Sequence, residues 1–252
     1  MLVDTHCHIH EADYPLDAVE TLGRAFDNGV SRLICIGTNE ESSRQAVTFA
    51  AEHDGVYAAV GVHPHDTKDG WGDIAELVRS VDAVHSVVAV GEIGLDYFYT
   101  HSPREVQIKA LEEQIDVALK HDLPIIFHVR EAFADFWPIF NNFSGIRGVL
   151  HSFTDSQANL DIGLSHGLYV GVNGISTFTR DIAQKAVFTT IPLGRLLLET
   201  DAPFLTPAPL RGKVNEPVFV KNIALFHAAD RNISFEEVAR ATTTNACALF
   251  AL

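Results

Sequence analysis

The sequence predicts an α/β protein with a single (β/α)8 TIM barrel over residues 1–252. Its length suits one such barrel. Short apolar runs alternate with longer amphipathic stretches from end to end, which predicts βα repeats with parallel strands. No linker or composition shift marks a domain boundary. The rival fold is an open doubly wound sheet, but no Gly-x-Gly-x-x-Gly follows the first predicted strand, and eight βα units are many for such a sheet.

Eight strands are expected where apolar and β-branched residues cluster. Several of these runs are almost continuously apolar, which is typical of parallel strands that are buried on both faces. The predicted strands cover residues 2–8, 32–37, 56–63, 87–92, 124–129, 148–151, 168–172 and 196–201.

Helices are expected between and after these strands. Amphipathic patterns predict helices over residues 16–28, 40–53 and 106–121. Turn signals such as Asn28-Gly29 and His166-Gly167 stand just before a strand, where a helix end is expected. A proline-rich loop over 202–217 follows the last strand and leads to two closing helices, 218–229 and 235–250.

The composition restricts the possible partners. The chain has 18 basic and 33 acidic residues, so its formal net charge is −15. This charge excludes strong, nonspecific electrostatic binding to the backbone of nucleic acids. A local anion site stays open, because bound divalent cations reverse the charge inside a cleft. No apolar run is long enough to span a membrane, and no obligate protein partner is evident. Three scattered cysteines predict a reducing, cytoplasmic environment.

Metal-binding residue types recur at the carboxyl ends of the predicted strands, where barrels place their reactive groups. The first strand carries His6 and His8, whose side chains share a face because alternate residues of a strand point the same way. Two imidazoles at this spacing can bind one metal ion, whereas Cys7 has the opposite parity and is expected in the core. The remaining candidates at strand ends are His63, Glu92, His128, His151 and Asp201.

Each of these side chains taken singly could make a structural hydrogen bond, but a converging ring of them favours a metal site. Glu92 follows an apolar run, and an unpaired carboxylate there is costly to bury. The number of candidate ligands exceeds what one catalytic zinc ion takes, which predicts two divalent ions with Glu92 as a bridge. The donors suit Zn, Mn, Fe or Co, and also Mg where phosphate supplies oxygen ligands.

Seven ordered motifs span the chain and resemble the TatD family of metal-dependent deoxyribonucleases. The motifs are DTHCHIH (4–10), GVHPHD (61–66), GEIGLDYFY (91–99), PIIFHVREAF (124–133), HSFT (151–154), LETDAPFLTP (198–207) and RGKVNEP (211–217). The resemblance implies a TIM-barrel hydrolase of the metallo-dependent type that cleaves DNA phosphodiesters. Phe127 and Val129 depart from the common pattern, where smaller or hydroxyl residues are more usual, and this puts the shape of the pocket in question.

The resemblance also implies roles for individual residues. His6, His8, Glu92 and Asp201 would hold one ion, and Glu92, His128 and His151 would hold the second. His63 is a candidate for binding substrate phosphate or a third ion.

The expected chemistry is hydrolysis of a phosphodiester by metal-activated water, with Glu92 as the bridging ligand and Asp201 orienting the water and accepting its proton. Glu199 is expected to fix the tautomer of a ligand histidine. Arg130 would bind phosphate or pair with Glu92 or Glu199. Arg211 and Lys213 would contact phosphate, with solvated loop charge as the alternative.

The substrate expected on these grounds is a short stretch of DNA, at an end or in a single strand, that is bound weakly and with metal. Loop aromatics could stack a nucleobase, namely Tyr97, Phe98, Tyr99, Phe153 and Phe178. Three alternatives stay open: a small-molecule phosphoesterase, an amidohydrolase with the same metal centre, and a metal-binding scaffold without catalysis. The absence of a lysine at a bridging position disfavours the amidohydrolase.

Overall fold

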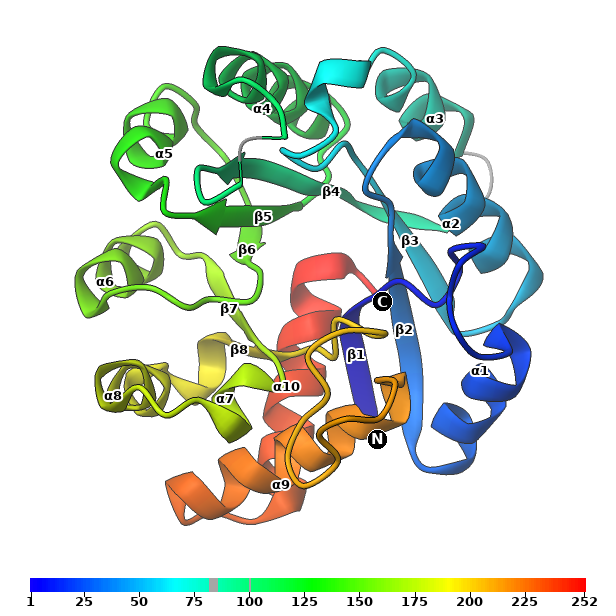
Figure 1. Ribbon diagram of the computed structural model, residues 1–252, viewed down its shortest axis with the longest axis vertical. Coiled ribbons are helices and arrows are strands. Elements are labelled where there is room, and N and C mark those ends of the chain that lie inside the picture. The colour runs from blue at the N-terminus through cyan, green and yellow to red at the C-terminus, as the bar shows by residue number, and fades with distance from the viewer. Residues whose placement is uncertain (82–85, 100) are drawn as a thin grey trace. The chain divides into compact units, whose positions relative to one another are not determined.

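The computed structural model describes residues 1–81, 86–99 and 101–252. Eight parallel strands follow one another in chain order, β1 to β8, within one sheet. Helices alternate with the strands along the chain (Figure 1). The predicted (β/α)8 class is therefore confirmed.

The chain divides into two compact units. The first unit consists of Met1–Cys35 together with Ser152–Leu252, and the second unit consists of Ile36–His151. A single domain over residues 1–252 stays a prediction.

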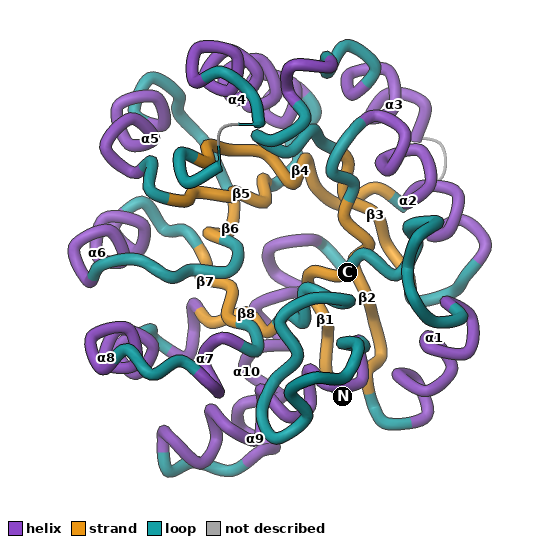
Figure 2. The backbone as a smooth tube through the Cα atoms, in the orientation of Figure 1, coloured by secondary structure: helices purple, strands orange, loops and turns teal. Residues whose placement is uncertain are grey.

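The first unit contains the two ends of the chain. Its strands are β1 (Leu2–Cys7), most of β2 (Val30–Ile36), β7 (Tyr169–Val172) and β8 (Leu196–Leu198). Its helices are α1 (Ala18–Asp27), α6 (Gln157–Ser165), α7 (Ile175–Phe178), α8 (Ile182–Thr190), α9 (Val220–Arg231) and α10 (Phe235–Phe250), with short 3₁₀ turns at Leu193–Arg195 and Pro217–Phe219. The loop that joins β8 to the closing helices is the long segment between them in Figure 2.

The second unit contains the middle of the chain. Its strands are β3 (Val56–Val60), β4 (Val87–Asp96), β5 (Ile125–Arg130) and β6 (Gly148–Leu150). Its helices are α2 (Glu40–Glu52), α3 (Ile74–Val81), α4 (Arg104–Lys120) and α5 (Phe133–Phe140), with a 3₁₀ turn at Thr67–Asp69.

Local sequence explains where several helices begin. Asp17, Asn39 and Ser234 precede α1, α2 and α10, and each side chain accepts a hydrogen bond from a backbone N–H in the first turn. These contacts satisfy amides that have no partner inside the helix. Strand β1 is buried along its whole length, as predicted for a strand covered on both faces. Cys7 is buried, which confirms its predicted place in the core.

Most strand ends differ from the predicted ones, and the differences at the candidate ligands matter for function. Strands β1, β3, β6 and β8 end before His8, His63, His151 and Asp201, so these side chains lie outside the strands. Asp201 has a left-handed backbone with φ of 60°, which a strand does not accommodate. Strand β4 instead runs on to Asp96, because its last residues pair with β5, with Asp96 opposite Arg130.

Among the described residues, no helix combines the length and the apolar character that crossing a bilayer requires.

Candidate metal centre

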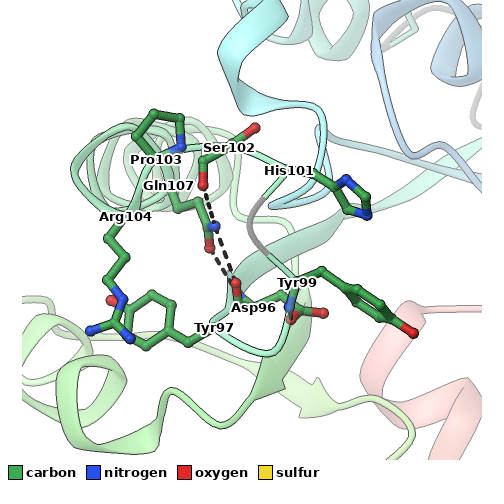
Figure 3. A pocket seen from close by; sticks show the side chains of 8 residues that line it. All are labelled: Asp96, Tyr97, Tyr99, His101, Ser102, Pro103, Arg104 and Gln107. Carbon is green, nitrogen blue, oxygen red and sulfur yellow. Dashed lines mark hydrogen bonds between the residues drawn. The ribbon is translucent and has the colours of Figure 1, made fainter.

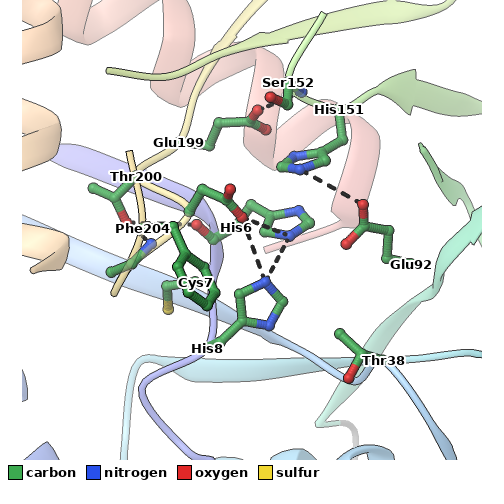
Figure 4. Close-up of polar contacts among 12 residues, drawn as sticks. His6, Cys7, His8, Thr38, Glu92, His151, Ser152, Glu199, Thr200 and Phe204 are labelled. Carbon is green, nitrogen blue, oxygen red and sulfur yellow. Dashed lines mark hydrogen bonds and ion pairs between the residues drawn. The ribbon is translucent and has the colours of Figure 1, made fainter. Parts of the chain in front are cut away.

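Three predicted ligands of the first unit meet at one point, and we call His6, His8 and Asp201 the first ligand set. The Nε2 atoms of His6 and His8 lie 3.2 Å apart. Oδ1 of Asp201 lies 3.5 Å from His6 Nε2 and 3.4 Å from His8 Nε2. Figure 4 shows both rings turned toward one another. The two rings thus lie on one face, as expected, while their role as metal ligands stays a prediction.

The spacing of the first ligand set fits a divalent cation. Ligand atoms on neighbouring corners of a tetrahedron with bonds of about 2.1 Å lie about 3.4 Å apart. The three separations in this set, 3.2, 3.4 and 3.5 Å, agree with that spacing. Two imidazole nitrogens and one carboxylate oxygen are also the donors that zinc and similar ions prefer.

A buried hydrogen-bond network connects the segments that carry the first ligand set. The carboxylate of Asp4 accepts the N–H of Thr200 at 2.8 Å and the Thr200 hydroxyl at 2.5 Å. Asn215 in turn donates to the Thr200 carbonyl oxygen at 2.8 Å. Burial raises the pKa of Asp4 well above its ordinary value, although the hydrogen bonds from Thr200 oppose this shift. The network thus joins β1 to the backbone directly before Asp201.

Backbone hydrogen bonds also join the end of β1 to the loop after β8, and these two segments carry the first ligand set. The Asp201 N–H donates to the His6 carbonyl oxygen at 2.8 Å. The His8 N–H donates to the Ala202 carbonyl oxygen at the same distance. These two bonds fix the spacing between the loops that carry the ligands. The side chain of Asp201 keeps 16% of its surface exposed, so water can reach it.

The second unit gathers four other predicted residues, which we call the second ligand set: Glu92, His63, His128 and His151. From Glu92 Oε1 the distances are 2.8 Å to His128 Nδ1, 3.6 Å to His151 Nε2 and 3.9 Å to His63 Nε2. Glu92, His63 and His128 each offer a ligand atom, and these atoms lie within 4.8 Å of one another. This set, too, has a suitable mixture of donors for a divalent cation.

Two residues that sequence reasoning missed, Asp96 and His65, complete the surroundings of His128. Oδ2 of Asp96 lies 2.9 Å from His128 Nε2 and 3.0 Å from His65 Nε2. Asp96 is 1% exposed. Both stand within quoted motifs, Asp96 in GEIGLDYFY and His65 in GVHPHD, so the sequence offered them as polar neighbours of predicted ligands, but their contacts with His128 depend on the fold.

The charges in this cluster shift its pKa values in opposite directions. Burial disfavours the charged forms of both Asp96 and His128. Hydrogen bonds from His128 and His65 nevertheless lower the pKa of Asp96 far below its ordinary value. Hydrogen bonds to Asp96 and Glu92 raise the pKa of His128 to about 9. Burial and the neighbouring charge of His128 lower the pKa of His63 well below its ordinary value.

Two glycines let β4 approach its neighbour in the second unit. A Cβ on Gly91 would lie 2.6 Å from the Ile126 Cβ, and a Cβ on Gly94 would overlap the His128 carbonyl oxygen. Gly94 also has a φ of 155°, which side chains rarely tolerate. At Gly94 this close approach sets the distance between β4 and the strand that carries His128.

Glu199 lies in the first unit and is buried. Its Oε1 accepts the Ser152 N–H at 2.6 Å, as drawn in Figure 4. The carboxylate fills the space where Gly171 lacks a side chain. Its predicted role in fixing a histidine tautomer stays a prediction.

Three of the predicted phosphate contacts, Arg130, Arg211 and Lys213, are exposed cations. The Arg130 guanidinium covers the Phe98 ring at 3.9 Å and the Tyr99 ring at 5.1 Å, and none of the described ion pairs joins it to Glu92 or Glu199. The Arg211 guanidinium covers the Phe178 ring at 3.8 Å. Lys213 is exposed, and only its backbone oxygen has a described hydrogen bond, from Thr206.

The aromatic candidates for base stacking separate into exposed and covered rings. Phe98 is 48% exposed and Tyr99 is 41% exposed. Phe153 is buried in the core, so its predicted contact with a base is wrong. Phe178 has Arg211 on one face.

A pocket of about 340 Å³ lies beside the second ligand set. Figure 3 shows its lining, which consists of Asp96, Tyr97, Tyr99, His101, Ser102, Pro103, Arg104 and Gln107. The ring of His101 stacks on Tyr99 with centroids 5.5 Å apart. The pocket thus offers aromatic rings and one exposed guanidinium next to Asp96.

Comparisons with known proteins, by family model, sequence and structure, all find relatives of one family. A family model described as TatD related DNase matches residues 3–251. An uncharacterized metal-dependent hydrolase from Bacillus subtilis, YabD, is 38% identical over 252 residues, which cover 99% of each chain. An Erwinia amylovora protein named 3′-5′ ssDNA/RNA exonuclease TatD is 34% identical and covers 100% of both chains. The crystal structure of YJJV, a TatD homologue from Escherichia coli, has a TM-score of 0.90 at 30% identity and covers 100% of this chain and 98% of its own.

Proposed function

Because the chain belongs to the TatD-related family of DNases, we propose that it is a divalent-metal-dependent nuclease that removes nucleotides from DNA ends or single strands. The family and its curated relatives support a metal-dependent hydrolase. The nucleic-acid substrate is the finer part of the proposal, and the relatives that are named exonucleases support it.

The observation that carries the proposal is the first ligand set. Three donors from β1 and the loop after β8 converge at the spacing of a metal coordination shell. When bound, divalent cations would supply Lewis acidity toward phosphoryl oxygens and lower the pKa of coordinated water.

The residues then take the following roles in our proposal. His6, His8 and Asp201 hold one ion, and His128 and His151 hold a second. Glu92 serves both ions, as the family resemblance implies. His63 is a ligand for a third ion or a contact for phosphate.

Asp201 is the proposed proton acceptor. Its carboxylate is partly exposed and faces both histidines of its set, so it can orient an attacking water and take up the proton. Arg130, Arg211 and Lys213 are the proposed phosphate contacts, because each is an exposed cation. With a net charge of −15, the protein should bind only a short stretch of nucleic acid.

The test is a substrate panel on protein whose metal content has been measured. Chelator-stripped protein is reloaded with Mn²⁺ or Zn²⁺ and given a 5′-labelled single-stranded oligonucleotide, p-nitrophenyl phosphate, its bis-ester and an amide. We expect the oligonucleotide to be shortened from its 3′ end, the reaction to stop with chelator and the metal to restore it. Turnover of the monoester or the amide alone would identify a phosphoesterase or an amidohydrolase, and metal binding without turnover would identify a scaffold.

A further inference from the structure

Asp96 uses both oxygens of a buried carboxylate, and the two oxygens serve different partners. Oδ2 accepts hydrogen bonds from His128 Nε2 at 2.9 Å and from His65 Nε2 at 3.0 Å. Oδ1 accepts the backbone N–H groups of Phe98 and Tyr99, each at 3.0 Å. One side chain therefore joins a predicted metal ligand to the exposed aromatic segment that follows β4.

We propose that Asp96 is a positioning residue of the metal centre, which keeps a proton on His128 Nε2 so that Nδ1 is the nitrogen left to bind a cation. The Nε2 atom faces Asp96, whereas Nδ1 lies 2.8 Å from Glu92 Oε1. Because a carboxylate accepts but does not donate, both ring nitrogens donate when no cation is bound. A cation beside Glu92 would take the place of the proton on Nδ1, whereas the hydrogen bond to Asp96 keeps the proton on Nε2. Nδ1 is then the nitrogen that can bind a cation beside Glu92. This inference rests on the proposed metal-dependent function.

The same carboxylate sets the position of the aromatic segment. Its bonds to the N–H groups of Phe98 and Tyr99 turn the chain at the end of β4, and Arg130 covers both rings. The pocket in Figure 3 is lined in part by this segment. Asp96 thereby couples the shape of the pocket to the orientation of His128.

The backbone of Asp96 is held independently of its side chain, by Gln107 of α4. The Asp96 N–H donates to Gln107 Oε1 at 2.9 Å, and Gln107 Nε2 donates to the Asp96 carbonyl oxygen at 3.1 Å. A substitution that changes only the side-chain chemistry should therefore leave the end of β4 in place.

Asp96→Asn tests the role of the carboxylate most directly, because the variant keeps the shape of the side chain and replaces one acceptor oxygen by an NH2 group. If the amide nitrogen faces His128, it donates and moves the imidazole proton to Nδ1, which removes the metal-binding lone pair. If it faces Phe98 and Tyr99, it opposes two N–H donors. Asp135→Asn is the matched control, since Asp135 accepts the Tyr97 hydroxyl at 2.7 Å in the same unit and has no described contact with a histidine.

The experiment titrates Co²⁺ into chelator-stripped protein and follows heat and visible absorption. We expect Asp96→Asn to weaken one Co²⁺ binding event by about 10–100-fold, with a changed d–d spectrum, and Asp135→Asn to match the wild type. Equal affinity and spectrum in both variants would overturn the role of Asp96. A wild type that binds no Co²⁺ would instead overturn the proposed function.

A measurement on the wild type keeps the inference testable if Asp96→Asn does not fold. Long-range ¹H–¹⁵N NMR of the Zn²⁺-loaded protein distinguishes protonated from metal-bound ring nitrogens. We expect His128 to carry its proton on Nε2 and to bind zinc through Nδ1. Zinc on Nε2 would contradict the proposal.

Discussion

The two ligand sets use similar side chains and hold them by different means. In the first set, the ligand atoms of His6, His8 and Asp201 face one another at 3.2 to 3.5 Å. In the second, Glu92 and His128 belong to a longer chain of short hydrogen bonds that alternates carboxylate and imidazole and continues through Asp96 to His65. The first set contains one carboxylate, whereas the chain in the second contains two.

The difference shows two ways to prepare a metal centre. In the first set the two rings face each other through the same Nε2 atoms that would bind the cation, so their hydrogen bond at 3.2 Å would give way to the cation. Ligands that are already hydrogen-bonded to carboxylates are oriented before the cation arrives. We therefore expect the first set to respond more strongly to changes at its carboxylate and the second to changes in its hydrogen bonds.

The largest effect should follow from neutralising the single carboxylate of the first set. Asp201→Asn keeps a residue type that tolerates the left-handed backbone, so the fold should be retained. Loss of a proton acceptor should lower the rate of oligonucleotide hydrolysis by about 10²–10⁴-fold. Single-turnover assays at saturating Mn²⁺ measure the effect, with the exposed Asp13→Asn as control. A rate equal to that of the wild type would remove Asp201 from the reaction.

A smaller effect separates the two sets by their metal content. Replacing both His6 and His8 with alanine removes two of the three donors of the first set. Elemental analysis of the purified variant should show about one ion fewer per chain, because the second set keeps its ligands. The exposed His166→Ala provides the control. Unchanged metal content would contradict the assignment of His6 and His8, and loss of all metal would show that the sets do not bind independently.

The smallest effect concerns acid stability at a histidine outside both sets. His227 on α9 is buried, and its burial, together with the charge of Arg231, lowers its pKa to about 3. Because the unfolded chain takes up this proton near pH 6.5 and the folded chain does not, stability falls as the pH drops below about 6.5.

The comparison with His227→Gln isolates this contribution. Each pH unit between about 6.5 and 3 should cost the wild type up to about 1.4 kcal/mol at this site. The difference in unfolding free energy between wild type and variant should therefore shrink by about 2 kcal/mol from pH 6.5 to pH 4.5. Urea unfolding of chelated proteins measures it. A constant difference would place the acid sensitivity elsewhere, for instance at the ligand sets.

The sequence was sufficient for the order of the elements and for the residue types at the strand ends. Apolar runs bounded by turn signals located all eight strands, and the predicted helix over 235–250 agrees with α10. Parity predicted that His6 and His8 share a face, because alternation along a strand is a local property. These features depend on near neighbours in the chain.

The contacts of Asp96 could not be predicted, because they depend on register between strands. The predicted strand stopped at Glu92, the first charged residue of the run, but β4 continues to Asp96 through its pairing with β5. Only that pairing brings Asp96 to His128, 32 positions away in the chain. The ring contacts of Arg130 were missed for the same reason, since guanidinium and aromatic side chains meet there through the fold.

The left-handed backbone at Asp201 limits how this position can vary. Short polar side chains such as those of Asp and Asn accept a φ of 60° more readily than longer ones. Exchange of Asp for Glu, which is often harmless for an acid at a protein surface, should therefore be unfavourable here for reasons of chain geometry alone. An engineer who wishes to alter the ion preference of this protein would do better to vary the histidines and leave this aspartate unchanged.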